Sequence, residues 1–213
     1  MSKVVIFGAG GRVGRAAVAE AVRRGHSVTA VVRDPAKYPD LDGGSGVTVV
    51  RGDATDPDAV ARAAAGHDAA INASVRLDVS SEAYFTATAH ALITGLREAG
   101  VGRLLVLGIA TTLETAPGVR IMDDPQFPVE YRTFSQGHVV EFDLLATGAG
   151  PLDWLMVVPP MDLTPDAPAT GHYLTAVDTV TGTGRISHAD LAVALLDEID
   201  TPKHHAVQLA VSH

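Results

Sequence analysis

A regular alternation of short apolar runs with alanine-rich stretches is the feature that most constrains the fold. The apolar runs are nearly continuous, as in strands covered on both faces, and the stretches between them have helical spacing. A repeated strand–helix–strand order predicts an α/β fold with a doubly wound parallel sheet and right-handed crossovers. We expect strands at residues 4–7, 28–32, 47–50, 69–73, 104–107, 155–158 and 206–211, and helices at 13–24, 56–65, 81–99, 129–146 and 188–199, with Gly25, Gly66 and Gly100 at helix ends.

Two stretches interrupt this alternation, at residues 111–128 and 159–185, and both are rich in proline and glycine. Each follows the end of an expected strand, and ligands of such sheets bind beyond the carboxyl ends of the strands. Long loops without a role are uncommon, which favours pocket walls over plain surface connections. We expect one domain over residues 1–213, with a small substrate-pocket lobe formed by these two loops.

A glycine-rich turn joins the first expected strand to the first expected helix. It reads Gly8-Ala9-Gly10-Gly11-Arg12-Val13-Gly14. Glycines permit a tight turn, a close approach of the backbone to a diphosphate, and close packing of helix on strand. The helix start then offers unpaired N–H groups and positive partial charge to the phosphates. This context predicts a Rossmann-type fold that binds a nicotinamide dinucleotide over residues 8–14.

The residue after the second expected strand indicates which dinucleotide is bound. NAD-binding proteins usually place an acidic residue there for the ribose 2′-hydroxyl. This chain has Arg33, which pairs with a 2′-phosphate through charge-assisted hydrogen bonds, and Arg12 is within reach of the same group. The alternative is that Arg33 is a solvated surface side chain. We therefore predict NADPH as the cofactor in preference to NADH.

The ends of the third and fourth expected strands supply further candidate cofactor contacts. Asp53 is placed to accept from the adenine amino group, and Ala54 follows it. Thr55 or Asp56 is expected to cap the next helix. At the end of the fourth strand, Ala73 and Ser74 are small enough for the cofactor to lie close to the backbone.

With these residues, the chain resembles atypical short-chain dehydrogenases/reductases. Within that group it is similar to small bacterial NAD(P)H-binding proteins described as NADH–flavin reductases, relatives of biliverdin-IXβ/flavin reductase. The resemblance covers essentially the whole chain and implies an NAD(P)H cofactor and reductase chemistry. Its motifs are Gly8-x-x-Gly11-x-x-Gly14, Val32-Arg33-Asp34-Pro35-x-Lys37, Gly52-Asp53, Leu152-Asp153-Trp154, Pro159-Pro160, Thr170-Gly171-x-Tyr173, Ile186-Ser187-x-x-Asp190-Leu191-Ala192 and Asp197-Glu198-Ile199-x-x-Pro202.

The resemblance also implies an acceptor pocket above the nicotinamide, walled by the ends of the fifth and sixth strands. Gly108 and Pro159 stand at those ends and are expected to border the cofactor. The biliverdin enzyme has a serine and a histidine where this chain has Ala110 and Met161. The loss of both polar groups argues against biliverdin as the substrate.

Three polar residues near this expected pocket are candidates for catalysis: Thr111, Tyr131 and His138. Of these, His138 alone has an ordinary pKa near neutrality. For each residue, packing or surface placement is the alternative. A similar alternative holds for Ser187 and Asp190, which we interpret as a helix N-cap with its capping-box partner.

The Tyr-x-x-x-Lys pair of the larger dehydrogenase family is absent. Lysine occurs only at positions 3, 37 and 203, and none of these follows a tyrosine by four residues. Reduction of a ketone needs a proton delivered to its oxygen, whereas a flavin or a conjugated pigment spreads the incoming charge over its π-system. We therefore predict hydride transfer from NADPH to a planar conjugated acceptor such as a flavin or a quinone-like compound.

Composition limits the other function classes. The formal net charge of −9 disfavours nucleic acid and anionic membranes, there is no cysteine, and the nine histidines show no metal-ligand spacing. Because a strand begins at residue 3, no signal peptide is expected, and we predict a cytoplasmic protein. A homodimer remains compatible with the sequence. The alternatives to a reductase are a non-catalytic NADP(H)-sensing regulator and a biosynthetic isomerase or cyclase, because fold alone does not decide function.

Overall fold

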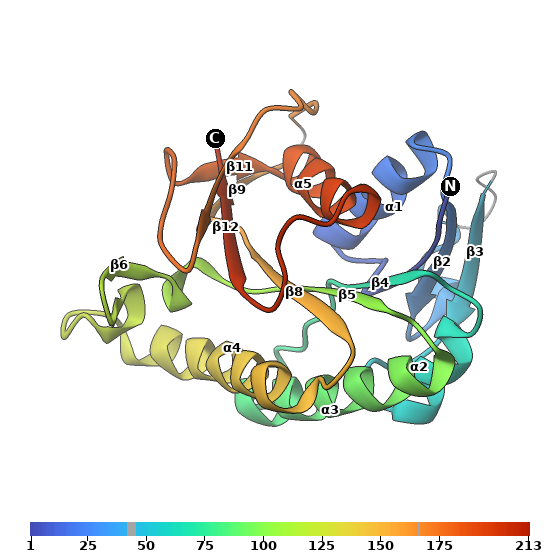
Figure 1. Ribbon diagram of the computed structural model, residues 1–213, viewed down its shortest axis with the longest axis horizontal. Coiled ribbons are helices and arrows are strands. Elements are labelled where there is room, and N and C mark those ends of the chain that lie inside the picture. Colours follow the sequence, from blue (N-terminus) through green and yellow to red (C-terminus); the bar gives the residue numbers. More distant parts are fainter. Residues whose placement is uncertain (42–45, 166) are drawn as a thin grey trace.

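A mostly parallel sheet forms the centre of the molecule (Figure 1). The structure is a computed structural model that describes residues 1–41, 46–165 and 167–213. The strand order is β10-β12-β8-β5-β4-β1-β2-β3, and the order from β3 to β8 is that of a Rossmann fold, as predicted. The strands are β1 (Lys3–Phe7), β2 (Ser27–Val32), β3 (Val47–Arg51), β4 (Ala69–Asn72), β5 (Arg103–Leu107), β8 (Asp153–Val158), β10 (Leu174–Val177) and β12 (Gln208–Ser212).

Helices cover both faces of this sheet. In Figure 1, α1 (Arg12–Arg23) and α5 (His188–Asp200) lie on one face, and α2 (Pro57–Ala64), α3 (Ser81–Ala99) and α4 (Val129–Gly148) lie on the other. Because side chains alternate along a strand, Val4 and Ile6 of β1 pack in the core under α1 and α5. Val5 and Phe7 pack in the core over α2 to α4.

Local signals explain where the helices begin and end. The Asp56 side chain accepts from the backbone N–H groups of Asp58 and Ala59 at the start of α2. The Ser80 side chain accepts from the Ala83 N–H at the start of α3, which ends at Gly100 with a φ of 73°, a left-handed conformation that glycine adopts without strain. These starts and ends lie within two residues of the predicted ones.

The two segments expected to be loops contain short strands, which corrects the prediction. In residues 111–128, β6 (Glu114–Ala116) pairs with β7 (Val119–Arg120). In residues 159–185, β9 (Asp162–Thr164) pairs with β11 (Arg185–Ser187), and β10 adds an antiparallel edge to the predicted parallel sheet. Strands of two to four residues are too short to show periodicity, and β9, β10 and β11 are completed by partners distant in the chain. Asp166 lies outside the described residues.

Asp190 holds the second of these segments against α5. Its carboxylate, which is fully buried, accepts from the backbone N–H groups of Thr170 and Gly171, both at 2.8 Å. It also accepts from the hydroxyls of Thr170 and Ser187 and from Nε2 of His213. The predicted N-cap is confirmed, since Ser187 Oγ accepts from the Asp190 N–H at 2.9 Å. The carboxylate, however, bonds the 159–185 segment instead of completing a capping box.

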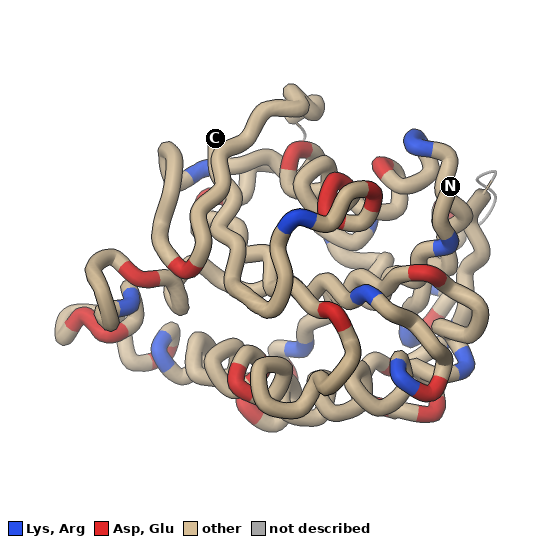
Figure 2. Tube along the Cα trace, viewed as in Figure 1, with Lys and Arg blue, Asp and Glu red and all other residues tan. Residues whose placement is uncertain are grey.

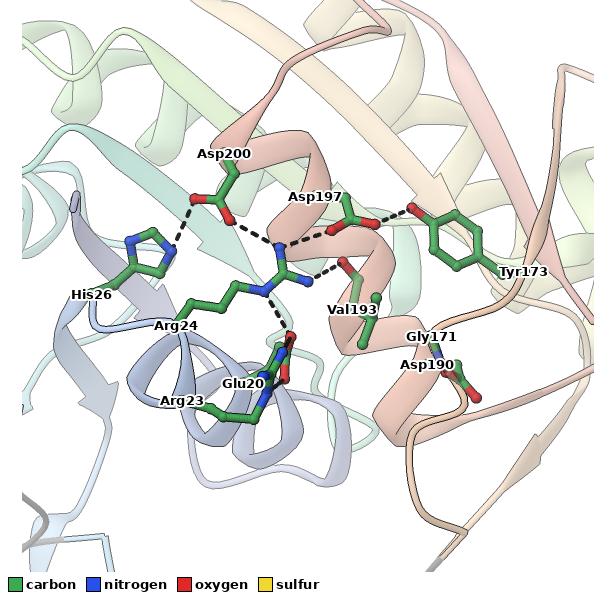
Figure 3. A network of polar contacts seen from close by, with 10 residues as sticks. All are labelled: Glu20, Arg23, Arg24, His26, Gly171, Tyr173, Asp190, Val193, Asp197 and Asp200. Carbon is green, nitrogen blue, oxygen red and sulfur yellow. Dashed lines mark hydrogen bonds and ion pairs between the residues drawn. The ribbon is translucent and has the colours of Figure 1, made fainter.

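A second polar network joins α5 to α1 (Figure 3). Arg24, at the end of α1, forms ion pairs with Glu20, Asp197 and Asp200 at 2.7–2.9 Å. Tyr173 donates to Asp197 at 2.6 Å, so the network also contacts the segment that Asp190 holds. One face of the sheet is thereby tied to the segment beyond β8.

Charged residues of both signs are interspersed over the trace (Figure 2). Basic positions occur on both helical layers and on the loops, with acidic positions between them. Among the described residues, no helix combines the length and the apolar character that crossing a bilayer requires.

Candidate functional site

The glycine-rich turn is built by contacts that leave no room for a side chain. Gly8 has a φ of +74°, and a Cβ there would lie 2.6 Å from the backbone of Ala73. A Cβ on Gly14 would lie 2.2 Å from the Gly8 carbonyl oxygen. The N–H of Gly11 donates to that same oxygen at 2.9 Å, which closes the turn. Strand β1, the turn and the start of α1 are therefore in direct contact.

The first turn of α1 presents backbone N–H groups without a competing side chain. Its N-cap is Gly11, and its first turn contains no acidic residue. By contrast, Asp56, Ser80 and Ser187 cap α2, α3 and α5 through their side chains. An uncapped helix start carries unpaired donors and positive partial charge. These residues fit the diphosphate of a dinucleotide.

A cavity of about 180 Å³ lies beside this turn, at the carboxyl ends of β1 to β4. It brings together eight of the residues predicted to contact the cofactor: Gly8, Gly10, Gly11, Arg33, Asp53, Ala54, Ala73 and Ser74. The remaining described residues of its lining are Phe7, Val31, Val32, Tyr38, Gly52, Val75, Arg76 and Tyr84.

Five other predicted cofactor residues lie outside this lining. Arg12 is exposed on the first turn of α1, and Val13 is half-buried against the core. Gly14 packs on Gly8, and Gly108 packs so closely on Met156 that a Cβ would lie 2.8 Å from its Cγ. Pro159 lines a second cavity, which is described below.

Asp53 has one carboxylate oxygen engaged within the chain. Its Oδ1 accepts from the N–H of Thr55 at 2.9 Å and from the Thr55 hydroxyl at 2.7 Å. Partial burial opposes ionisation, but these two bonds and the positive charges of Arg33 and Arg76 hold the pKa of Asp53 below its usual value. The carboxylate is therefore charged at neutral pH, and the described hydrogen bonds engage its Oδ1 and leave Oδ2 without one.

Sequence reasoning missed Tyr38, Arg76 and Tyr84 in this lining. The Tyr38 ring lies on the turn so closely that a Cβ on Gly10 would be 2.5 Å from it. Tyr84 donates to Ser74 Oγ at 2.7 Å, and Ser74 donates to Asn72 Oδ1 at 2.6 Å. No periodic pattern marks these residues. A search for polar residues just after strand ends would have found Arg76, four residues beyond β4.

The second cavity, of about 460 Å³, lies beyond the ends of β5 and β8. Both segments predicted to be pocket walls contribute to it, the first with the candidate Thr111 and the second with the cofactor candidate Pro159, and α4 contributes the candidate Tyr131. The lining is almost entirely apolar and consists of Ile109, Ala110, Thr111, Phe127, Tyr131, Phe134, Ser135, Pro159, Pro160, Met161 and Leu163.

The hydroxyl proton of Thr111 is already committed. Ser135 donates to the backbone carbonyl of Tyr131 at 2.7 Å, which uses its single hydrogen. The 2.7 Å contact between Thr111 Oγ1 and Ser135 Oγ must then have Thr111 as the donor. Thr111 therefore presents acceptor lone pairs, and Tyr131, which is 61% exposed, has no side-chain hydrogen bond among the described contacts.

His138 does not line either cavity. It shares one stripe of α4 with Tyr131 and Ser135, but the cavity ends at Ser135 and His138 lies almost one turn further along the helix. There its ring centroid lies 3.9 Å from that of Phe85, and its Nδ1 lies 3.4 Å from Oε2 of buried Glu141. Burial raises the pKa of Glu141. The structure thus separates His138 from Thr111 and Tyr131.

A third, larger cavity of about 760 Å³ lies away from both, between α5 and residues 170–175. The acidic side chains in its lining already have partners within the chain: Tyr173 and Arg24 bond Asp197, and His204 and Arg103 bond Glu198. These acidic side chains therefore serve the polar contacts that hold the fold together.

Known proteins share this arrangement. The chain is 34% identical over 210 residues to the uncharacterised protein YwnB of Bacillus subtilis, covering 95% of this chain and 94% of YwnB. A candidate epimerase from Bacteroides thetaiotaomicron is 31% identical with a TM-score of 0.86, covering 100% of this chain and 97% of that one. A candidate NADH–flavin reductase from Streptococcus pneumoniae is 30% identical with a TM-score of 0.83, covering 100% of both chains.

The family comparison agrees with the geometry of the turn. The NAD(P)H-binding family matches residues 8–202, a range that begins at the first glycine of the turn. The uncapped start of α1 and the closely packed glycines of the turn are the features that such a cofactor requires. This chain belongs to the NAD(P)H-binding family.

Proposed function

We propose that this protein is an NADPH-dependent reductase that transfers hydride to a planar conjugated acceptor, such as a flavin or a quinone. The observation that carries the proposal is the chemistry of the cavity beyond β5 and β8. Among its described lining residues, Tyr131 is the one ionisable side chain, and it stands exposed at the mouth. The walls of the cavity are almost entirely apolar, and its described lining contains no buried acid.

The missing acid selects the kind of acceptor. Bound NADPH would supply a hydride, which is two electrons and one proton. A ketone would then need a second proton at its oxygen at once, and Thr111 has given its hydrogen to Ser135. A flavin or quinone distributes the added charge over its rings, so water at the open side of the cavity supplies that proton afterwards.

The chain's own contribution is positioning. The strand order places the two cavities at one edge of the sheet, the first beyond β1 to β4 and the second beyond β5 and β8. A dinucleotide whose diphosphate lies at the start of α1 would direct its nicotinamide toward Ile109 and Pro159. Holding two rings at contact distance is itself a large contribution to such a reaction.

The choice of NADPH rests on the charges of the first cavity. Arg33 stands directly after β2, where an NAD-binding protein usually has a carboxylate. Arg76 lines the same cavity. Two guanidinium groups there favour a ligand with a phosphate at the ribose.

The test is oxidation of NADPH, followed by its absorbance, with a panel of flavins, quinones and conjugated ketones, and with a saturated ketone for contrast. We expect turnover with the conjugated acceptors and none with the saturated ketone. Tyr131→Phe and Thr111→Val should retain kcat within about threefold, because neither hydroxyl is required as an acid; a general acid would contribute about a hundredfold or more. Tight NADPH binding without turnover on any acceptor would instead identify a sensor and overturn the reductase.

A further inference from the structure

Arg76 lines the first cavity, beside the glycine-rich turn, which we call the cofactor cavity. A carboxylate from the same loop binds the Arg76 side chain. Its Nε lies 2.9 Å from Asp78 Oδ1 and its Nη2 lies 2.5 Å from Asp78 Oδ2, a two-point pairing of fork on fork. Arg76 lines the cavity with Arg33 and Asp53, and its side chain is 29% exposed, whereas that of Asp78 is 66% exposed. The guanidinium is thus oriented, and its partner stands on the solvent side.

The lining of this cavity differs in charge from the protein as a whole. Two arginines stand in it against one aspartate, in a chain whose formal net charge is −9. The charge of Asp53 acts on Arg76, and the charge of Arg33 acts on Asp78, so these four groups lie close enough to interact. Arg33, directly after β2, has no bidentate carboxylate partner among the described contacts.

The planar fork of an arginine binds a carboxylate and a phosphate in the same way. Hydrogen bonds from Arg76 hold the pKa of Asp78 at about 2, so this carboxylate is charged at neutral pH. Asp78 therefore occupies the face of Arg76 that a phosphate of a ligand would use. An exposed carboxylate that pairs with an arginine is only weakly held and can be displaced by a doubly charged phosphate.

We infer that Arg76 is a second reader of the 2′-phosphate of NADPH, opposite Arg33, and that Asp78 is an internal competitor that the phosphate displaces. The inference rests on the cofactor assignment of the proposed function. It predicts opposite effects at two neighbouring residues. Loss of Arg76 weakens binding of the 2′-phosphate, and loss of the Asp78 charge strengthens it.

The experiment is calorimetric titration with two adenosine fragments, 2′,5′-ADP and 5′-AMP, which need no turnover. Arg76→Gln should weaken the binding of 2′,5′-ADP by about tenfold or more. It should leave the affinity for 5′-AMP within about twofold of wild type, because a charge-assisted pair is lost only from the complex with 2′,5′-ADP. Asp78→Asn should tighten 2′,5′-ADP by about threefold, and added salt should reduce that gain.

Arg120→Gln is the matched control. Arg120 makes the same two-point contact with Asp123, on an exposed segment that lines neither the cofactor cavity nor the acceptor cavity. It should change neither affinity. Unfolding midpoints of all three variants show whether each remains folded.

The inference would be overturned if Arg76→Gln weakened the binding of both fragments equally, or if Asp78→Asn weakened the binding of 2′,5′-ADP. The two proposals fail separately. Selective fragment binding without NADPH oxidation would leave Arg76 as the reader and remove the reductase. NADPH oxidation, together with an equal effect of Arg76→Gln on the binding of both fragments, would keep the reductase and remove the role of Arg76.

Discussion

Replacing Asp190 by alanine tests how the wall beyond β8 is held in place. The carboxylate accepts five hydrogen bonds, of which two come from the backbone of residues 170 and 171. A hydrogen bond to a charged group contributes about 1.5–3 kcal/mol when its donor stays buried. The donors of Thr170, Gly171 and His213 reach water once released, while the Ser187 hydroxyl, 1% exposed, does not. We therefore expect a loss of about 3 kcal/mol in the free energy of unfolding, well below the sum of the five bonds.

The pH dependence of this loss checks its electrostatic origin. Burial opposes ionisation, but the bonds to Gly171, His213, Ser187 and Thr170 outweigh it and hold the pKa of Asp190 below its usual value. A carboxyl with a lowered pKa stabilises the fold above the unfolded-state pKa of about 3.9, and this contribution is lost as pH falls through the folded-state pKa. The difference in stability between wild type and Asp190→Ala should thus shrink as pH falls below the unfolded-state pKa and through the lower folded-state pKa of Asp190.

Urea unfolding at several pH values measures both quantities, and hydrogen exchange of the Thr170 and Gly171 amides reports on the segment itself. Asp143→Ala, at an exposed position of α4, is the control and should cost less than about 0.5 kcal/mol. A loss below about 1 kcal/mol at neutral pH, or a loss independent of pH, would refute the reasoning.

Three further predictions concern other parts of the fold. The double substitution of His138 and Glu141 by leucine should raise the free energy of unfolding by about 1–4 kcal/mol. Because burial has raised the pKa of Glu141, this gain should grow as pH rises. Destabilisation in urea unfolding would contradict this prediction. Gly14→Ala should abolish calorimetric NADPH binding, because its Cβ would lie 2.2 Å from the Gly8 oxygen, whereas Gly148→Ala, with 3.7 Å to its nearest neighbour, should keep binding unchanged. Arg24→Gln should lower the thermal midpoint through a loss of about 2 kcal/mol, because three carboxylates lose their shared partner; an unchanged midpoint would show that water replaces it fully.

The parts of the fold that were predictable from sequence depend on local patterns. Continuous apolar runs mark strands that are covered on both faces, and these predictions were confirmed for the seven expected strands, which are β1 to β5, β8 and β12. The glycine turn was equally visible, because its residue types follow directly from the backbone geometry.

The remaining features depend on contacts between distant residues. Edge strand β10 exists because β12 lies beside it, and nothing in residues 174–177 indicates that pairing. His138 fits the helical stripe of Tyr131, yet packing against Phe85 and Phe134 decides that it stays buried beyond the cavity. For Asp190, the capping pattern was visible, but the loop that its carboxylate bonds is twenty residues away in the chain.

The linings of the first two cavities share no described residue, and this separation has a consequence for how such proteins diversify. Substitutions in residues 109–135 or 159–163 would alter the shape of the second cavity, while the turn and α1 keep their contacts. The second cavity can therefore change during evolution without a change in the glycine-rich turn and the start of α1. Such independence would let one inherited framework serve lineages that carry out unrelated chemistry.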